Sequence, residues 1–427
     1  MPRATRRSFL TTLASVPLVA GATAPARAAG PGAQAAAQAR SGTDADIFAA
    51  ARRQFLMPVD VTYCNTGTLG ATPRPVVEAM NRGVETLERD LPDWPYFQAD
   101  GEPLTGYQQL IDARTTMGSL INAPADEVAI TQNATMGMSM VGAGLDWKAG
   151  DEVISTDHEH TGGISSFKVA AKRFGIVVKE LPLSTLAQGG PEAIVKGFAD
   201  AMTPRTRAIM FSHITSGLGI LMPTQALCTL ARERGALSLV DGAQAIGQIL
   251  VDVKALGCDA YVTSPHKWLL APKGTGVLYS RAGVQDRFWT TLASTAWDDH
   301  AKGAFRFMQY GTGSVPVLQG LLAAAAFMKD LGLERVARWD AMLTARLRTG
   351  LAAIPKARLS SPADPRLAAA ITTFRVEGVT ARALQDALWA HRIRVRAQGD
   401  DRGVRLSAHL YVSPANIDTI LEVARGL

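Results

Sequence analysis

The sequence predicts an α/β protein with a largely parallel sheet and a second, smaller α+β lobe. Three observations support this prediction. Short apolar strands alternate with helical patterns from residue 107 onward, which is typical of a parallel sheet. From about residue 318 the pattern changes to two long helices followed by short strands. The chain has 427 residues, 47% hydrophobic and 19% charged, which is enough for a large core.

The first 28 residues have the features of an export signal. The stretch "TRRSFLTTLASVPLVAGATAPARA" combines a basic start, an apolar stretch and the small-x-small site Ala26-Arg27-Ala28. The paired arginines followed by Ser-Phe-Leu resemble the twin-arginine signal, with an ordinary Sec signal as the alternative. Residues 29–43 are rich in Ala, Gly and Gln and predict a flexible spacer. We therefore expect a periplasmic protein that meets the twin-arginine translocase during export.

The charge and cysteine content exclude several function classes. The formal net charge is +6, of which the arginines of residues 1–28 carry +4, so the remainder carries only +2. No basic stripe indicates a nucleic-acid partner, and no internal run predicts a membrane anchor. The three cysteines include no C-x-x-C pair, and no cluster has zinc-like spacing, so we expect no metal. Cys228 and Cys258 are expected to be small core residues.

The elements can be predicted in order along the chain. Residues 44–74 form an N-terminal segment with a Gly/Pro turn, and a helix starts at about Pro75. The large domain spans 75–315, with strands predicted at 127–130, 151–155, 176–181, 207–211, 237–240, 259–263 and 276–279, and helices between them, such as 191–202 and 223–234. The small domain spans 316–427, with helices at about 316–330 and 333–353 and strands near 370–376 and 403–408.

Ligands of open α/β sheets bind beyond the carboxyl ends of the strands, and two of these ends carry suggestive polar residues. In "TQNATMG", before a helix expected from Met136, backbone amides and the Thr135 hydroxyl indicate an anion site. In "DGAQ", Asp241 directly follows an apolar strand, where a carboxylate is costly unless it is paired. A protonated ring nitrogen would pair it. Simple helix capping is the alternative interpretation of both motifs.

Two further strand ends complete the pattern. In "TDHEHTGG", a flat imidazole could stack on a flat ring, with an exposed turn histidine as the alternative. In "SPHKW", Lys267 could form a Schiff base with a carbonyl beside an anion-binding Ser and His, with a surface lysine as the alternative. Together the four strand ends describe a phosphate, a ring with a basic nitrogen and an aldehyde. That ligand is pyridoxal 5′-phosphate.

The order and spacing of these motifs resemble the class V aminotransferases. These fold-type I pyridoxal-phosphate enzymes include cysteine desulfurases and isopenicillin N epimerase. The resemblance runs from about residue 60 to the end. It implies a large domain with a mostly parallel seven-stranded sheet and a smaller C-terminal α+β domain. The stretches "YCNTGTLGATP", "WPYFQADGEP" and "SHITSGLGILMP" look most like the isopenicillin N epimerase-like branch.

The resemblance implies a role for each matching residue. Lys267 would form the bond to the cofactor and later move protons, Asp241 would hold the ring nitrogen protonated, and His160 would stack on the ring. Gln244 would contact the phenolic oxygen of the ring, and Ala243 would lie against its other face. The implied phosphate contacts are Ala134, Thr135, Ser264, His266 and, from a second subunit, Thr312. The last of these implies a homodimer.

The resemblance also implies how a substrate is held. Arg405, in "VRLSAHLYVSPANID", resembles the arginine that binds the substrate α-carboxylate, with a surface ion pair as the alternative. The residues that we expect to face the substrate come from the epimerase-like stretches: Asn65, Thr66, Tyr96 and Ser216.

The predicted function is a periplasmic enzyme that acts on an amino acid, or on an amino-acid group of a larger metabolite. It would work through a Lys267 aldimine and a quinonoid. Epimerisation, transamination, elimination and oxidation stay open, because fold and cofactor permit all of them. A protein that binds a metabolite without turnover is the alternative from another class. A cytosolic enzyme is the alternative if the N-terminus is not a signal.

Two features narrow this prediction. No cysteine follows Cys258, so the sulfur-accepting nucleophile of a cysteine desulfurase is missing and that activity is disfavoured. The twin-arginine route carries folded, cofactor-loaded proteins, and pyridoxal phosphate is made in the cytosol, so the export signal and the cofactor support each other. In length, signal and motifs the chain resembles a periplasmic member of the family that modifies a glutamate side chain in pyoverdine siderophore maturation.

Overall fold

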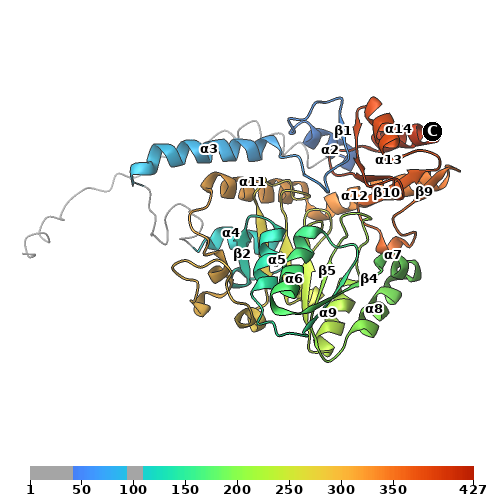
Figure 1. The fold of residues 1–427 in the computed structure, drawn as a ribbon. Coiled ribbons are helices and arrows are strands. Elements are labelled where there is room, and N and C mark those ends of the chain that lie inside the picture. Colours follow the sequence, from blue (N-terminus) through green and yellow to red (C-terminus); the bar gives the residue numbers. More distant parts are fainter. Residues whose placement is uncertain (1–41, 94–108) are drawn as a thin grey trace, which may run out of the picture. The chain divides into compact units, whose positions relative to one another are not determined.

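A seven-stranded sheet forms the centre of the chain in a computed structural model that describes residues 42–93 and 109–427 (Figure 1). The strand order is β2-β8-β7-β6-β5-β3-β4, and within this sheet only β8 runs against its neighbours. The strands are β2 (Val128–Thr131), β3 (Glu152–Thr156), β4 (Val177–Leu181), β5 (Thr206–Ser212), β6 (Leu237–Asp241), β7 (Ala260–Thr263) and β8 (Gly276–Ser280). Each of the seven predicted strands is confirmed, and the mostly parallel sheet with them.

Helices follow most of these strands, as the alternating pattern predicts. They are α4 (Ile111–Ser119), α5 (Ala134–Ala143), α6 (Thr161–Phe174), α7 (Leu183–Leu186), α8 (Gly190–Ala201), α9 (Thr224–Glu233) and α10 (Val253–Leu256). Helix α5 begins two residues before the predicted Met136, because the Asn133 side chain caps it: its Oδ1 accepts the Met136 amide at 2.8 Å. Short 3₁₀ turns are η1 (Leu91–Asp93), η2 (Ala125–Glu127), η3 (Ala187–Gly189), η4 (Ala282–Arg287), η5 (His300–Met308) and η6 (Pro365–Leu367).

A four-stranded antiparallel sheet of order β12-β13-β10-β9 lies in the C-terminal part. Its strands are β9 (Ala357–Leu359), β10 (Ile371–Val376), β12 (Arg396–Ala397) and β13 (Val404–Ser407). The predicted strands near 370–376 and 403–408 are confirmed as β10 and β13. The other two were not predicted, since they have only three and two residues and carry little periodic signal.

Long helices accompany this second sheet. They are α11 (Val315–Leu331), α12 (Leu333–Ala352), α13 (Ala381–Ala390) and α14 (Pro414–Arg425). Helix α11 packs against α3 (Arg74–Asp90), and α12 packs against α14. Within the described residues no single helix is long and apolar enough to cross a bilayer. Only α11 and α12 taken together pass that test, and they are bent by 74° where they meet.

The N-terminal segment connects the two sheets. After α2 (Asp44–Arg52), strand β1 (Thr62–Tyr63) pairs with β11 (Ile393–Arg394). The chain then contacts both sides of the fold: the Thr66 amide donates to the Ser407 carbonyl at 3.4 Å, and the Gly70 amide donates to the His266 carbonyl at 2.9 Å. A Cβ at Gly70 would lie 1.8 Å from the Lys267 carbonyl oxygen, so only glycine allows this approach.

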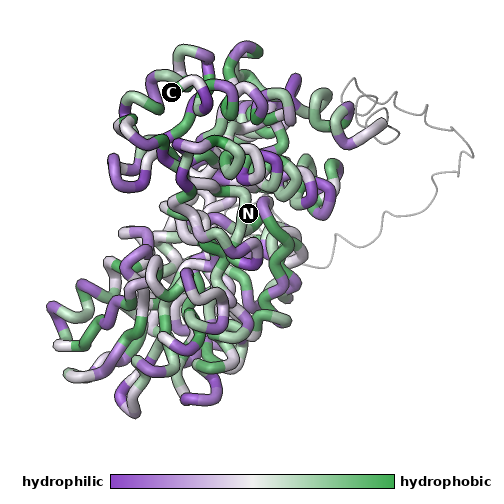
Figure 2. Tube along the Cα trace, turned by 90° about the vertical axis from the view of Figure 1, so that its right-hand side faces the viewer, coloured by the Kyte–Doolittle hydropathy of each residue, from purple (hydrophilic) through white to green (hydrophobic). Residues whose placement is uncertain are grey.

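The strands of the large sheet form part of the apolar core. Strands β2, β7 and β8 are buried at every position, as expected for a sheet covered on both faces. Figure 2 shows the hydrophobic stretches in the interior of the fold and hydrophilic residues at many of the outer turns. The carboxyl ends of the parallel strands therefore emerge from a rigid core and can hold polar side chains in fixed positions.

Candidate active site

One pocket, with a volume of about 280 Å³, is lined by the large sheet, the small sheet and the N-terminal segment. It brings together most of the residues predicted for the site: Ala134, Thr135, His160, Ser216, Asp241, Ala243, Gln244, Ser264, His266, Lys267 and Arg405. It also contains five residues that were not predicted: Gly67, Thr68, Asn133, Gly162 and Arg396. The four strand ends singled out in the sequence thus meet at one place.

Lys267 follows β7 in a tight turn that holds its backbone. Its amide donates to the Ser264 carbonyl at 3.1 Å, and the Ala271 amide donates to the Pro265 carbonyl at 3.1 Å. Leu270 in this turn has a φ of +62°, which costs a residue with a side chain about 1–2 kcal/mol. Strain of this kind persists where the surrounding structure determines the position of a functional segment.

The amine of Lys267 lies among groups of both charges. Burial lowers its pKa to about 8, Asp241 opposes that shift, and Arg405 and Arg396 add to it. A lysine with a pKa near 8 is partly neutral close to neutral pH, and the neutral amine is the nucleophile toward an aldehyde. This pKa is compatible with the Schiff-base role predicted for Lys267.

Asp241 ends β6 with its side chain almost fully buried, at 5% exposed. Its Oδ1 accepts the Ala243 amide at 2.9 Å. Gly163 faces the other oxygen closely, because a Cβ there would lie 2.9 Å from Oδ2. Among residues 42–93 and 109–427, Oδ2 has no hydrogen-bond donor. Asp241 lines the pocket, so this acceptor is available to a protonated ring nitrogen there.

The N-terminus of α5 forms an anion site. The Ala134 amide donates to Ser264 Oγ at 3.0 Å, and the Met136 amide is bound to the capping Asn133. Between them, neither the amide nor the hydroxyl of Thr135 has a partner in the described part of the chain. A free amide at the start of a ten-residue helix, beside two hydroxyls, is suited to a phosphate.

His266 lies at the same end of the pocket and is neutral. Burial, followed by the charge of Lys267, lowers the pKa of this imidazole to about 4. Its Nδ1 is buried and has no hydrogen-bond partner among the described residues. A neutral ring can offer one N–H donor to a phosphate oxygen. The donors at this end therefore have the chemistry of a phosphate site.

His160 caps α6 and lies exposed on the pocket. Its Nδ1 accepts the Gly162 amide at 3.0 Å, so the ring is fixed at one edge. Burial of the ring, followed by the charge of Lys267, lowers its pKa. A fixed, neutral, flat ring is suited to stacking on a second flat ring. Ala243, predicted for the other face of such a ring, also lines the pocket.

Gln244 is held by two neighbours. Its Oε1 accepts the indole N–H of Trp268 at 2.7 Å, and its Nε2 donates to the Gly67 carbonyl at 2.8 Å. An amide nitrogen carries two hydrogens, so one N–H stays available. This is the donor that the predicted contact with a phenolic oxygen needs.

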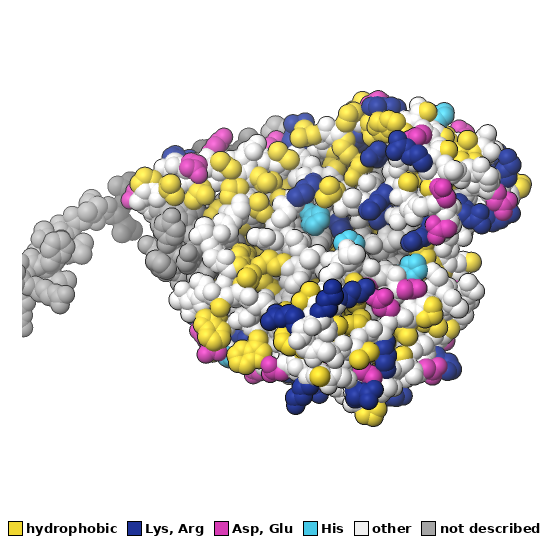
Figure 3. All heavy atoms as spheres, viewed as in Figure 1, with side chains coloured by type: hydrophobic (Ala, Val, Ile, Leu, Met, Phe, Trp, Pro, Cys, Tyr) yellow, Lys and Arg dark blue, Asp and Glu magenta, His cyan; other side chains and the backbone are white. Residues whose placement is uncertain are grey.

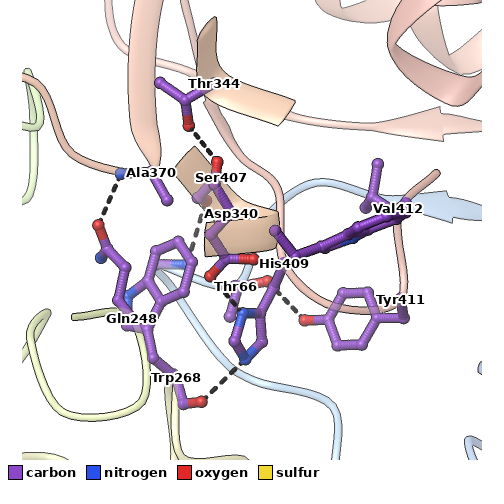
Figure 4. A network of polar contacts seen from close by, with 12 residues as sticks. Thr66, Gln248, Trp268, Asp340, Thr344, Ala370, Ser407, His409, Tyr411 and Val412 are labelled. Carbon is purple, nitrogen blue, oxygen red and sulfur yellow. Dashed lines mark hydrogen bonds and ion pairs between the residues drawn. The ribbon is translucent and has the colours of Figure 1, made fainter. Parts of the chain in front are cut away.

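A buried polar network begins at the backbone of Trp268, the residue after Lys267 (Figure 4). His409 contacts the Asp340 carboxylate through Nδ1 at 2.7 Å and the Trp268 carbonyl through Nε2 at 2.9 Å. His409 and Asp340 are 0% and 1% exposed, and burial raises the pKa of Asp340. Because the Trp268 carbonyl oxygen can only accept, His409 donates to it through Nε2–H, and Nδ1 forms a second hydrogen bond with Asp340 Oδ2. The network ties the residue after Lys267 to α12.

Arg405 is fixed by neutral acceptors. Its Nη1 donates to the Ser216 carbonyl at 2.8 Å, and its Nη2 donates to Asn65 Oδ1 at 3.1 Å and to Thr68 Oγ1 at 2.5 Å. The side chain is 2% exposed, and its buried Nε has no partner among the described residues. A buried guanidinium without a carboxylate is a strong candidate for binding one from a ligand.

Four predicted residues lie elsewhere or outside the described structure. Asn65 does not line the pocket, because its Oδ1 holds Arg405. The expectation that Thr66 faces the substrate is wrong: it is fully buried and its hydroxyl bonds to Tyr411. Thr312 is exposed and does not line this pocket, so its contact with a second copy stays a prediction. Tyr96 and residues 1–41 lie outside the described residues.

Sequence reasoning missed Arg396 and Thr68, and a signal for the first was present. In "RIRVR", residues 392–396, arginines alternate with apolar residues, which is the pattern of a strand with one basic face. The structure places Arg396 on β12, and its Nη1 donates to Thr68 Oγ1 at 3.3 Å. Thr68 has no comparable signal, because its role depends on side chains that are distant in the sequence.

A half-buried carboxyl near Asp241, that of Glu159, was also missed. It accepts Thr156 Oγ1 at 2.7 Å and Ser212 Oγ at 2.6 Å. Burial, aided by the nearby charge of Asp241, raises its pKa to about 7, although the hydrogen bonds from the two hydroxyls oppose this shift. It lies between the two histidines of "TDHEHTGG", where the sequence analysis considered only the histidines.

The three cysteines are buried. Burial raises the thiol pKa of Cys64 and Cys228 to about 12, and that of Cys258 well above its ordinary value. Because the thiolate is the nucleophile, none of these thiols is reactive. The prediction that Cys228 and Cys258 are small core residues is confirmed.

The chain is similar to known proteins over most of its length. The profile of the family "Aminotransferase class-V" matches residues 104–420. Isopenicillin N epimerase of Amycolatopsis lactamdurans is 30% identical over 410 residues, covering 90% of this chain and 99% of that protein. The epimerase of Streptomyces clavuligerus is 29% identical, covering 88% and 97%. A probable cysteine desulfurase of Pyrococcus abyssi is 24% identical, covering 88% and 96%.

Solved structures agree with the fold. A mutant of C-DES with glycine covalently linked to its PLP cofactor superposes with a TM-score of 0.78 at 27% identity, covering 87% of this chain and 98% of that chain. The complex of the cystine C-S lyase C-DES with cysteine persulfide gives 0.76 at 27% identity, covering 87% and 99%. These likenesses confirm the predicted fold-type I architecture. Since the family profile covers well over half of the sequence, the chain belongs to the aminotransferase class-V family.

Proposed function

We propose that this protein is a pyridoxal-phosphate enzyme that removes the α-proton of an amino acid, or of an amino-acid group within a larger metabolite. The observation that carries the proposal is the convergence of Lys267, Asp241 and the free N-terminus of α5 on one pocket. Epimerisation is the outcome that we favour, because two isopenicillin N epimerases are similar to this chain over nearly its whole length. A siderophore glutamate side chain is one substrate of this class.

Pyridoxal 5′-phosphate is the cofactor, and when bound it withdraws electrons from the α-carbon of an attached amino acid. The residues that would hold its phosphate are Thr135, Ser264 and His266, which offer an amide, two hydroxyls and a neutral imidazole. Asp241 Oδ2 would keep the ring nitrogen protonated, because an ionised carboxylate stabilises a neighbouring cation in a buried site.

Lys267 is the base for the α-proton. Its pKa of about 8 lets the amine accept a proton and give it back near neutral pH. Arg405 orients the substrate by binding the α-carboxylate, and its three neutral partners keep the guanidinium in place while the substrate enters and leaves. The backbone hydrogen bonds of the turn at 264–271 hold the Lys267 backbone in place.

Deuterium exchange tests this function directly. The purified protein is incubated in D₂O with free amino acids and with a peptide that carries a γ-linked glutamate with a free α-amine. We expect deuterium at the α-carbon and, for an epimerase, both configurations in the product. Lys267→Ala should lower the exchange rate by about 10³-fold. Exchange that is equally fast in this variant would refute the assignment of the base.

A cysteine desulfurase is not favoured, although such proteins are among the relatives. A desulfurase needs a reactive cysteine to accept sulfur, whereas the thiols of Cys64, Cys228 and Cys258 are buried and have raised pKa values. Incubation with L-cysteine should therefore release no sulfide above the level of a Lys267→Ala control.

We also propose that the protein is exported to the periplasm by the twin-arginine route. The support is the sequence of residues 1–28 and the need to bind the cofactor before export. Replacing Arg6 and Arg7 by lysine should keep the full-length chain in the cytosol. Mass spectrometry of both fractions checks this, and an intact Met1 in periplasmic wild-type protein contradicts cleavage.

A homodimer, expected from the role assigned to Thr312, can be tested by light scattering of the same material.

A further inference from the structure

Two arginines face each other across the strands that border the pocket. Arg396 on β12 pairs in register with Arg405 on β13, so both side chains lie on the same face of the sheet. Both line the pocket, and both donate to the hydroxyl of Thr68, at 3.3 and 2.5 Å. Thr68 donates its own hydrogen to Asn65 Oδ1 at 2.8 Å, so its lone pairs receive the two guanidinium groups.

This like-charged pair has no counter-ion in the described residues. Two other arginines near β12 and β13 lie close to carboxylates: Arg392 contacts Asp60 at 2.9 Å, and Arg402 contacts Asp401 at 3.5 Å. Neither Arg396 nor Arg405 lies within 4.0 Å of an acidic side chain in residues 42–93 and 109–427. Like charges directly opposite each other destabilise a sheet. Burial, followed by repulsion from Arg396, lowers the pKa of Arg405 to about 10.

The other charged groups of the pocket already have roles under the proposed function, Lys267 being the one that would bond to the cofactor. Asp241 would hold the ring nitrogen of the cofactor, and the N-terminus of α5 would hold its phosphate. The α-carboxylate of the substrate is matched by Arg405. The exposed guanidinium of Arg396, next to Arg405, is the charged group of the pocket to which no partner has been assigned.

We propose that Arg396 binds a second carboxylate of the substrate, so that the substrate is an amino acid, or an amino-acid group, that carries two carboxylates. This inference rests on the proposed function, since it uses the placement of the α-carboxylate on Arg405. It disfavours a γ-linked glutamate, whose second carboxyl is part of an amide, unless the larger metabolite supplies another carboxylate. Because Arg396 and Arg405 meet at Thr68, the two carboxylates bind side by side at the mouth of the pocket. Figure 3 shows basic and histidine side chains gathered in a band on one face of the molecule, which is suited to an anionic ligand.

The first test compares substrates of the holoenzyme. L-2-Aminoadipate and L-norleucine differ by the distal carboxylate, and each is assayed for α-deuterium exchange. The wild type should prefer aminoadipate, and Arg396→Gln should lower kcat/KM for aminoadipate by about 10- to 100-fold, mainly through KM. The loss for norleucine, which has no distal carboxylate, should be much smaller, since Arg396 then acts only through its effect on the pKa of Lys267. Equal losses for both substrates, or no loss for aminoadipate, overturn the proposal.

A second test does not depend on turnover. Glutarate has two carboxylates and no amine, whereas butyrate has one. Glutarate should raise the Tm of the holoenzyme more than butyrate does, and Arg396→Gln should remove this difference. Arg392→Gln is the matched control, because Arg392 is paired with Asp60 and does not line the pocket. If glutarate stabilises the wild type but no amino acid exchanges its α-proton, the proposed function fails and the anion site stands. If glutarate and butyrate act alike, the anion site fails.

Discussion

The two walls of the pocket differ in how their charges are balanced. The wall from the large sheet carries Asp241, helix-terminal amides, hydroxyls and a neutral His266, and its acid and base lie close together. The wall from the small sheet and the N-terminal segment carries Arg396 and Arg405, held only by neutral oxygens in the described residues. A resident cofactor can be matched by fixed groups. A substrate that enters and leaves is better met by unpaired charge, because its own charge completes the pair.

The first way to break this comparison is to neutralise the acid of the large-sheet wall. Asp241→Asn keeps the size and the acceptor for the Ala243 amide but removes the negative charge. We expect α-proton exchange to fall by about 10³-fold in kcat, since the ring nitrogen is no longer held protonated. The measurement is the exchange rate at saturating substrate. A change seen only in KM would mean that Asp241 contributes to substrate binding and does not hold the ring nitrogen of the cofactor.

The second way is to disrupt the Asp340–His409 contact, through which the small-sheet side is hydrogen-bonded to the Trp268 carbonyl on the large-sheet side. Asp340→Asn leaves His409 buried without its charged partner, and breaking such a pair costs about 3 kcal/mol of unfolding free energy. Chemical denaturation measures this loss. Asp200→Asn at the exposed pair with Lys196 is the control and should change stability by less than about 0.5 kcal/mol. Similar losses of unfolding free energy in both variants would show that the buried pair contributes no more to stability than an exposed one.

The third way uses the electrostatic effect of Arg405, on the small-sheet wall, on the pKa of Lys267, on the large-sheet wall. Since the pKa of Lys267 is lowered to about 8, the neutral amine becomes scarcer by tenfold for each pH unit below that value. Uptake of pyridoxal phosphate by the apoprotein should therefore be about 100-fold slower at pH 6 than at pH 9. Stopped-flow absorbance follows the uptake. Arg405→Gln should move the profile to higher pH, because Arg405 is one of the charges that lower this pKa.

The smallest effect concerns Glu159, behind the large-sheet wall. Its folded pKa is raised from 4.5 to about 7, so its contribution to stability is complete below pH 4.5 and is lost as the pH rises through 7. Such a change in pKa corresponds to about 3 kcal/mol. Because Glu159 is only half-buried, solvent screening should reduce the measured loss to about 2 kcal/mol. Glu159→Gln does not ionise, so the difference between variant and wild type should grow in favour of the variant from pH 5 to pH 8. Denaturation curves at both pH values check this. A difference that is the same at both values would contradict the raised pKa.

Much of the large-sheet wall could be predicted from the sequence. Each strand end carries its polar residues within a few positions of an apolar run, so periodicity alone places Thr135, His160, Asp241 and Lys267 at one edge of a sheet. The second wall was predicted less well. Arg405 was identified by resemblance, whereas Arg396, Thr68 and the true position of Thr66 were not.

The sequence by itself determined the strands, the large helices, the family and most of the residues that line the pocket, because these depend on local spacing along the chain. Only the tertiary structure decided which distant side chains touch. It placed Arg396 opposite Arg405, gave Asn65 the task of holding that arginine, and joined His409 to residues 69 and 141 positions away. The physical reason is that a hydrogen bond acts over about 3 Å, and no local pattern records which remote atoms the fold brings within that distance.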